Sequence, residues 1–233
     1  MEKKAINNQN KRAQISIIIT VLLGCIVMGI VDAVIQPGYW IKSAIKIMLF
    51  VLVPLVQVFL YEDLSMTRYF KTDRKSLGIT IAIGIAVFCV ILLAYFAFKN
   101  VFDFSAVTSS LNSSVGVSKA NFIWVALYIS FINSFIEEFF FRGFGFLKLK
   151  EKTTRRFAYL FSSFSFAAYH VSMMIGWFGW PVMVITIAGL AVGGAIFNYV
   201  DEKWGNIYTS WVIHMFANFS INTIGLILFN NIN

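Results

Sequence analysis

Long apolar runs, separated by short polar segments, follow one another along most of the chain. Each run holds enough residues to cross about 30 Å of hydrocarbon at a helical rise of about 1.5 Å per residue. The pattern therefore predicts an all-α, polytopic membrane protein folded as a helical bundle. The predicted transmembrane helices are seven, at residues 15–35, 41–61, 77–98, 121–147, 157–175, 181–200 and 207–229.

Two features leave room for an eighth membrane segment. Pro54 is able to interrupt the second run, and the stretch from Trp177 to Pro181 is able to re-enter the membrane. The first run follows basic residues as a signal peptide does, but it is too long for one and contains Asp32. We interpret it as a retained helix.

The composition agrees with a lipid environment. The chain of 233 residues is 59% apolar and 13% charged, whereas a soluble domain is about half apolar and about a quarter charged. The net charge of +8 does not indicate nucleic-acid binding, because the basic residues form short clusters between apolar runs. We expect residues 1–233 to form a single membrane domain with no separate soluble domain.

Basic residues are divided unequally between the two sides of the predicted bundle. Lys42, Lys46, Lys99 and Lys119 fall on one side, Arg142 lies within a span, and all the others fall on the side of the N-terminus. Because lysines and arginines favour the cytoplasmic side, we expect a cytoplasmic N-terminus in a multi-pass protein of the bacterial cytoplasmic membrane. Residues 102–120 are then a long outer loop.

Ionisable groups inside the spans are functional candidates, because burying them in lipid costs several kcal/mol when they have no partner. The fourth run carries Glu137, Glu138 and Arg142. Glu138 and Arg142 are four residues apart and can pair, which leaves Glu137 as a carboxylate without a local partner. The alternative is that these three residues only hold helices together.

Both histidines of the chain, His170 and His214, lie inside apolar runs. His214 belongs to a stripe of polar residues at intervals of four, with Ser210, Asn218 and Asn222. Counted from the cytoplasmic ends of their helices, Glu137 and the two histidines reach the same depth within about one helical turn. The sequence therefore predicts one shared site, reached more easily from the cytoplasmic side.

A carboxylate and an imidazole that hold one water form a general base. An imidazole and an amide one turn apart, as in His214 and Asn218, can point at one oxygen and form an oxyanion hole. The chain has no Gly-x-Ser-x-Gly elbow, Walker loop or His-Glu-x-x-His helix. Its two cysteines, Cys25 and Cys89, lie 64 positions apart within apolar runs and are assigned no function.

Three motifs carry a family resemblance. Residues 137–142 read Glu-Glu-x-x-x-Arg, residues 166–170 read Phe-x-x-x-His, and residues 214–218 read His-x-x-x-Asn. In this order, on three apolar helices, they resemble the motifs of the CPBP family, the CAAX proteases and bacteriocin-processing enzymes also called Abi, over about residues 121–220. The resemblance implies an intramembrane glutamic endopeptidase similar to type II CAAX prenyl endopeptidases, without a metal or other cofactor.

The resemblance also implies roles for individual residues. Glu137 and His170 would activate a water, and His214 and Asn218 would stabilise the oxyanion. Supporting residues would be Glu138, Arg142 and Phe166, the last of which is read from the sequence alone as a packing residue. Residues 121–229 would be the catalytic core, residues 1–120 would brace it, and the substrate would be a membrane-associated peptide or protein.

Two alternatives compete with this interpretation. Glu137, His170 and His214 are suitable zinc ligands, so a zinc-dependent protease is one of them. The other is a non-catalytic membrane protein, such as a bacteriocin immunity factor, a secretion chaperone or a transporter, in which Gly189, Gly193 and Gly194 allow close helix packing. The repeats typical of transporters are absent from the sequence. Neither the substrate nor the oligomeric state can be inferred from it.

Overall fold

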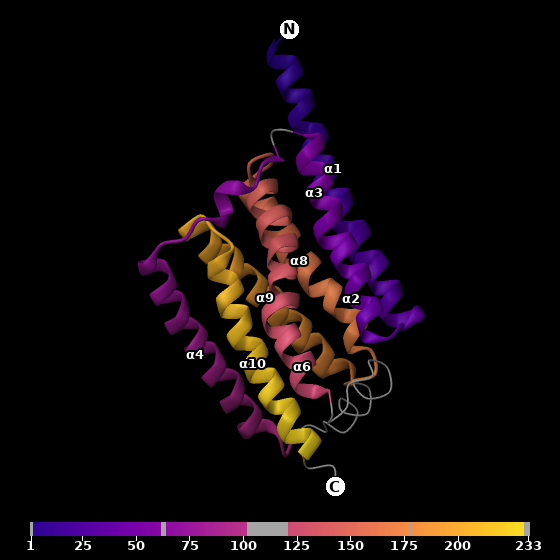
Figure 1. Cartoon of the computed structure of the whole chain (residues 1–233), viewed down its shortest axis with the longest axis vertical. Coiled ribbons are helices and arrows are strands. Elements are labelled where there is room, and N and C mark those ends of the chain that lie inside the picture. The colour runs from indigo at the N-terminus through magenta and orange to yellow at the C-terminus, as the bar shows by residue number, and fades with distance from the viewer. Residues whose placement is uncertain (1, 62–63, 102–120, 178, 231–233) are drawn as a thin grey trace.

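A computed structural model of the chain describes residues 2–61, 64–101, 121–177 and 179–230, and within these ranges it contains helices and no strand (Figure 1). The predicted all-α class is therefore confirmed for the described part. The expected outer loop at 102–120 lies outside the described residues. The α-helices are α1 (Glu2–Ile30), α2 (Tyr39–Ile47), α3 (Val53–Leu60), α4 (Arg74–Phe98), α6 (Phe122–Leu127), α7 (Ser134–Glu138), α8 (Arg155–Val171), α9 (Trp180–Trp204) and α10 (Tyr208–Asn230).

Wider and tighter helical turns link or extend these helices. The π-helical segments are η1 (Val31–Ile35), η2 (Met48–Leu52), η5 (Tyr128–Asn133) and η6 (Phe139–Lys148), and the 3₁₀ segments are η4 (Thr67–Phe70) and η7 (Ser172–Met174). Consequently α6, η5, α7 and η6 form one continuous helix, called the fourth span below.

Among the described residues, six helices are long and apolar enough to cross a membrane, so the chain is an integral membrane protein. They are Asn8–Ile35, Tyr39–Leu60, Arg74–Phe98, Phe122–Lys148, Trp180–Trp204 and Tyr208–Leu228. The fifth predicted run is also helical, as α8, but α8 has only 17 residues and is not among the six. Seven membrane-crossing helices thus remain a prediction.

Pro54 does not interrupt the second run, and re-entry of the membrane by residues 177–181 stays a prediction. Pro54 sits in the first turn of α3, directly after the π-helical η2, and the helix from Tyr39 to Leu60 continues through it. A proline lacks the amide N–H that a helix interior uses, and in a membrane helix a local π-helical segment such as η2 accommodates this loss. Pro181 likewise lies in the first turn of α9, which begins at Trp180.

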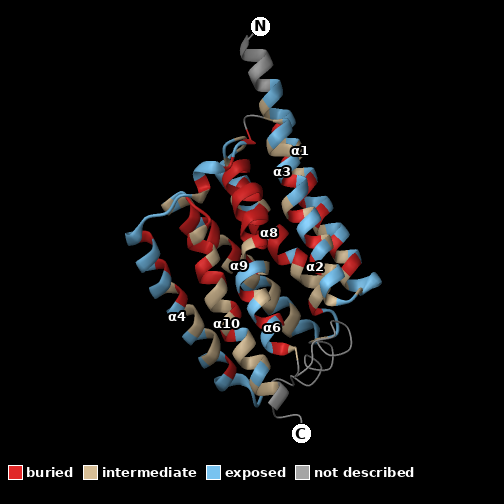
Figure 2. Ribbon diagram, in the orientation of Figure 1, coloured by how far each residue is buried: buried red, intermediate tan, exposed pale blue. Residues whose placement is uncertain are grey.

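The fourth span lies in the middle of the bundle (Figure 1). The first helices, α1 to α3, lie on one side of it, and α4 lies on the opposite edge and packs on α10. Figure 2 shows buried residues concentrated along the central helices and exposed residues along α4. All ten residues of η6 are buried, as expected for a helix with other helices packed around it.

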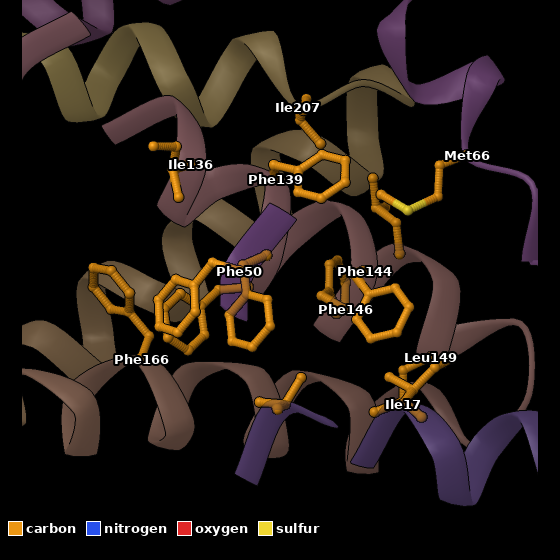
Figure 3. Close-up of a cluster of buried hydrophobic side chains, with 14 of the residues drawn as sticks. Ile17, Phe50, Met66, Ile136, Phe139, Phe144, Phe146, Leu149, Phe166 and Ile207 are labelled. Atoms are coloured by element: carbon orange, nitrogen blue, oxygen red, sulfur yellow. The ribbon is translucent and has the colours of Figure 1, made fainter. Parts of the chain in front are cut away.

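An aromatic core surrounds the fourth span (Figure 3). Phe50 of η2 stacks on Phe140 of η6 with ring centroids 3.9 Å apart and planes nearly parallel. Gly24 of α1 faces the same rings, and a Cβ there would lie 2.8 Å from the Phe140 ring. This packing joins the N-terminal helices to the fourth span and fixes their distance from the polar residues described next.

Candidate active site

Glu137 and Glu138 occupy the short α7 segment of the fourth span, between two π-helical segments. Both are buried, with 2% and 0% of the residue exposed. Neighbouring residues of an α-helix point about 100° apart. The two carboxylates therefore have different hydrogen-bond partners, although His214 of α10 lies near both.

The two oxygens of the Glu137 carboxylate have separate surroundings. Oε1 accepts hydrogen bonds from Nζ of Lys46, at 2.8 Å, and from Nδ2 of Asn133, at 2.9 Å. Oε2 lies 3.8 Å from Nε2 of His170 and 3.9 Å from Nε2 of His214. These separations exceed a direct hydrogen bond and suit one bridging water. The three groups predicted to share one depth are thus in one place.

The orientation of His170 is set by its own helix. Its Nδ1 lies 2.7 Å from the backbone oxygen of Phe166, one turn earlier in α8. A carbonyl only accepts hydrogen bonds, so Nδ1 carries the proton, and Nε2 of the neutral ring is an acceptor. The Phe166 ring stands edge-on to the imidazole, with centroids 4.5 Å apart. Phe166 therefore packs, as expected from the sequence, and also orients His170 through its backbone.

His214 of α10 is held by the other carboxylate. Its Nδ1 lies 2.7 Å from Oε1 of Glu138, and Oε2 of Glu138 lies 3.1 Å from Nε of Arg142, which confirms the predicted pair. The Arg142 guanidinium is centred 4.0 Å from the ring of Phe166 and 4.9 Å from that of Phe197. Ion pairing and ring stacking thus stabilise a buried arginine that orients Glu138.

The polar stripe of α10 divides between two neighbours. Ser210 donates to Asp201 of α9 through its hydroxyl, at 2.7 Å. Asn218 and Asn222 instead donate through Nδ2 to backbone oxygens of the fourth span, those of Ile129 and Ala126, each at 3.2 Å. The Asn218 amide therefore lies against the helix that carries Glu137.

Sequence reasoning missed two residues of the site, Lys46 and Asn133. The expectation that Glu137 has no local partner is wrong, because Asn133, one turn earlier, donates to its Oε1, as Lys46 does from α2. Lys46 was also assigned to the outer side, whereas it is buried in α2 with 4% exposure. The signals were present in the sequence, since Lys46 falls inside the second predicted span and Asn133 precedes Glu137 by one helical turn.

The residues that the structure describes contain no group of three or more His, Cys, Asp or Glu side chains placed to hold a metal ion. The set that a zinc-dependent protease requires, Glu137 with His170 and His214, is accordingly not found as such a group. The described arrangement consists of two carboxylates, two imidazoles and two basic side chains. Lys46 pairs with Glu137, and Arg142 pairs with Glu138.

Residues 119–220 match the family model described as type II CAAX prenyl endopeptidase Rce1-like. They form an Rce1-like domain. Searches of curated proteins and of solved structures give no significant match. The Rce1-like domain runs from just before α6 into α10 and contains the three motifs that carry the family resemblance. Lys46 lies outside it, in the N-terminal helices.

Proposed function

We propose that the Rce1-like domain is an intramembrane endopeptidase that hydrolyses peptide bonds of membrane-associated peptides or proteins. The observation that carries this proposal is the position of Oε2 of Glu137, which faces Nε2 of both His170 and His214 within 3.9 Å. Membership of the CAAX-protease family supports the same reaction class.

Glu137 and His170 activate the water in this proposal. A water between Oε2 of Glu137 and Nε2 of His170 donates one hydrogen bond to each, because both atoms are acceptors. Its oxygen lone pair is then directed at the peptide carbonyl carbon. Glu137 takes a proton as the new C–O bond forms and passes it to the leaving amine nitrogen as the C–N bond breaks.

His214 and Asn218 stabilise the tetrahedral oxyanion. Glu138 accepts from Nδ1 of His214 and thereby directs Nε2 of the ring towards Oε2 of Glu137. In a protonated imidazole Nε2–H is a donor, and we assign this N–H to the oxyanion. Asn218 uses one N–H for the Ile129 oxygen and retains the second N–H of its amide for the substrate. In a dry site such donors lower the barrier by several kcal/mol.

The test compares wild type with Glu137→Gln at matched abundance in cell membranes, with peptide termini identified by mass spectrometry. Glutamine keeps the shape of the side chain and removes the base. New termini should therefore occur only with the wild type. Glu202→Gln is a change of the same kind at a carboxylate that pairs with Arg155 and contacts none of the site residues above. It should give the wild-type termini.

Equal termini from wild type and Glu137→Gln would contradict the proposed mechanism. A cellular protection phenotype that persists in Glu137→Gln would favour the non-catalytic immunity hypothesis instead. Thermal unfolding of each purified variant in detergent establishes that the comparison is between folded proteins.

A further inference from the structure

Lys46 projects into the candidate active site from outside the Rce1-like domain. It lies in α2 and is 4% exposed. Its ammonium is centred 4.8 Å from the ring of Tyr169 and 5.9 Å from the ring of Phe50. A lysine buried among aromatic rings at membrane depth requires a partner, because an unpaired charge there is costly.

The partner is the carboxylate of Glu137. Nζ of Lys46 lies 2.8 Å from Oε1 of Glu137 and 2.6 Å from Oδ1 of Asn133. Asn133 donates in turn to the same Oε1, at 2.9 Å. The three side chains form a closed ring of hydrogen bonds, so each one restrains the other two.

This ring distinguishes the two oxygens of Glu137. Oε1 is occupied by two donors, and Oε2 is the oxygen directed at His170 and His214. Without Lys46, the carboxylate would have no lysine or arginine in contact with it among the described residues, since Arg142 pairs with Glu138.

We propose that Lys46 is a positioning residue: it holds Oε1 of Glu137 and balances its charge, so that Oε2 faces the two histidines. The catalytic consequence rests on the proposed peptidase function, whereas the ion pair and its effect on stability do not. The working site therefore includes α2 in addition to the Rce1-like domain.

The same helix supplies a matched control. Lys42 lies one turn before Lys46 and pairs with Asp32 of η1. It is likewise a lysine of α2 that neutralises a carboxylate with little exposure, but its partner is not Glu137 or either histidine. Lys42→Met therefore removes an ion pair of the same kind without removing a contact of the site.

The first experiment measures coupling without any substrate. Thermal unfolding in detergent is compared for wild type, Lys46→Met, Glu137→Gln and the double variant. Lys46→Met leaves a buried carboxylate unpaired, so its midpoint should fall by about 10 °C. The double variant contains no unpaired charge and should recover most of that loss. Additive losses in the double variant would overturn the proposal.

The second experiment measures cleavage of the peptide bonds identified with the wild type. Lys46→Met should lower kcat about 10²-fold with KM unchanged, because the carboxylate is misplaced while substrate contacts persist. Lys46→Arg retains the cation and should recover at least a tenth of wild-type kcat, and Lys42→Met should cleave at the wild-type rate. Equal kcat for Lys46→Met and Lys42→Met would overturn the positioning role, as would an arginine variant no better than methionine.

The cleavage results for Glu137→Gln and Lys46→Met distinguish a wrong peptidase mechanism from a wrong role for Lys46. If Glu137→Gln cleaves like the wild type, the peptidase mechanism is wrong, and the stability cycle alone decides whether Lys46 and Glu137 are coupled. If Glu137→Gln is inactive and Lys46→Met is fully active, the mechanism stands and the positioning role is wrong.

Discussion

At the scale of single residues, two neighbouring glutamates have different surroundings. Glu137 is paired with Lys46 and faces the Nε2 atoms of both histidines. Glu138 is paired with Arg142 and contacts Nδ1 of His214. Because His214 lies between them, the side chain that contacts one carboxylate also faces the other. We therefore assign the role of base to Glu137 and the supporting role to Glu138.

Asn218 and Asn222 allow the oxyanion role to be separated from helix packing. Each donates through Nδ2 to a backbone oxygen of the fourth span at 3.2 Å, so each alanine variant loses such a packing hydrogen bond, and Asn222→Ala also loses the bond to Oγ of Ser130. We predict that Asn218→Ala lowers kcat about 10²- to 10³-fold, as expected for loss of an oxyanion donor, and that Asn222→Ala changes it less than fivefold. Rates of peptide release, with unfolding midpoints as the control, would measure both; similar rates in the two variants would remove Asn218 from the mechanism.

The residues that sequence reasoning found and missed differ in one physical respect. Glutamate and histidine inside an apolar run have no role at the membrane interface that would explain them, so Glu137, His170 and His214 are predicted as site residues and their depths can be compared. Lys46 lies near the beginning of its span, where lysines usually extend to the interface, and was assigned there. Its contacts with the rings of Phe50 and Tyr169, and with the side chains of Asn133 and Glu137, show that it turns inward.

At the scale of helices, the fourth span departs from regular α-helical geometry on both sides of the glutamates. The π-helical segments η5 and η6 flank α7, and such turns often accompany functional sites. Backbone oxygens of this span accept side-chain donors from α10, including Nε1 of Trp211, which bonds the Phe131 oxygen at 3.0 Å. A periodicity of 3.6 residues locates the helix but does not predict its wide turns, so this feature was absent from the sequence-based expectation.

Close packing of α8 on α9 depends on Gly194. A Cβ at this position would lie 3.1 Å from Cα of Ser163 and 3.5 Å from Nη2 of Arg142, whereas a Cβ at Gly193 would meet nothing within 4 Å. We predict that Gly194→Leu destabilises the fold by about 1–3 kcal/mol through overpacking and lowers cleavage by displacing Arg142, while Gly193→Leu has the wild-type unfolding midpoint. Detergent unfolding curves test the prediction, and equal midpoints for the two leucine variants would contradict it.

At the scale of the whole molecule, two polar networks tie together the loops at the end that carries the N-terminus (Figure 1). Glu151 accepts from Arg68, Tyr69 and Lys148, and burial raises the pKa of the Tyr69 hydroxyl, which stays a neutral donor. Glu202 of α9 accepts from Lys150, Arg155 and Tyr159. Such a concentration of basic residues at one end is typical of a cytoplasmic face.

The orientation is testable with two single cysteines in a background with Cys25→Ser and Cys89→Ser. Lys203 is exposed near the end of α9 and Lys99 is exposed directly after α4, at opposite ends of the bundle (Figure 1). We predict that Lys99→Cys reacts with a membrane-impermeant maleimide in intact cells, and that Lys203→Cys reacts only after permeabilisation. The reverse pattern would contradict the proposed cytoplasmic N-terminus.

The buried pair of Lys46 and Glu137 has a consequence for how such a protein can be recombined. One charge belongs to the Rce1-like domain and the other to a helix that precedes it in the chain. A chimera that joins residues 119–220 to unrelated N-terminal helices would inherit an anion without its counter-ion. In a library of such chimeras, the stable members would be those in which the new second helix brings a cation to the same depth. The unit that can be exchanged between relatives is therefore longer than the unit that sequence similarity outlines.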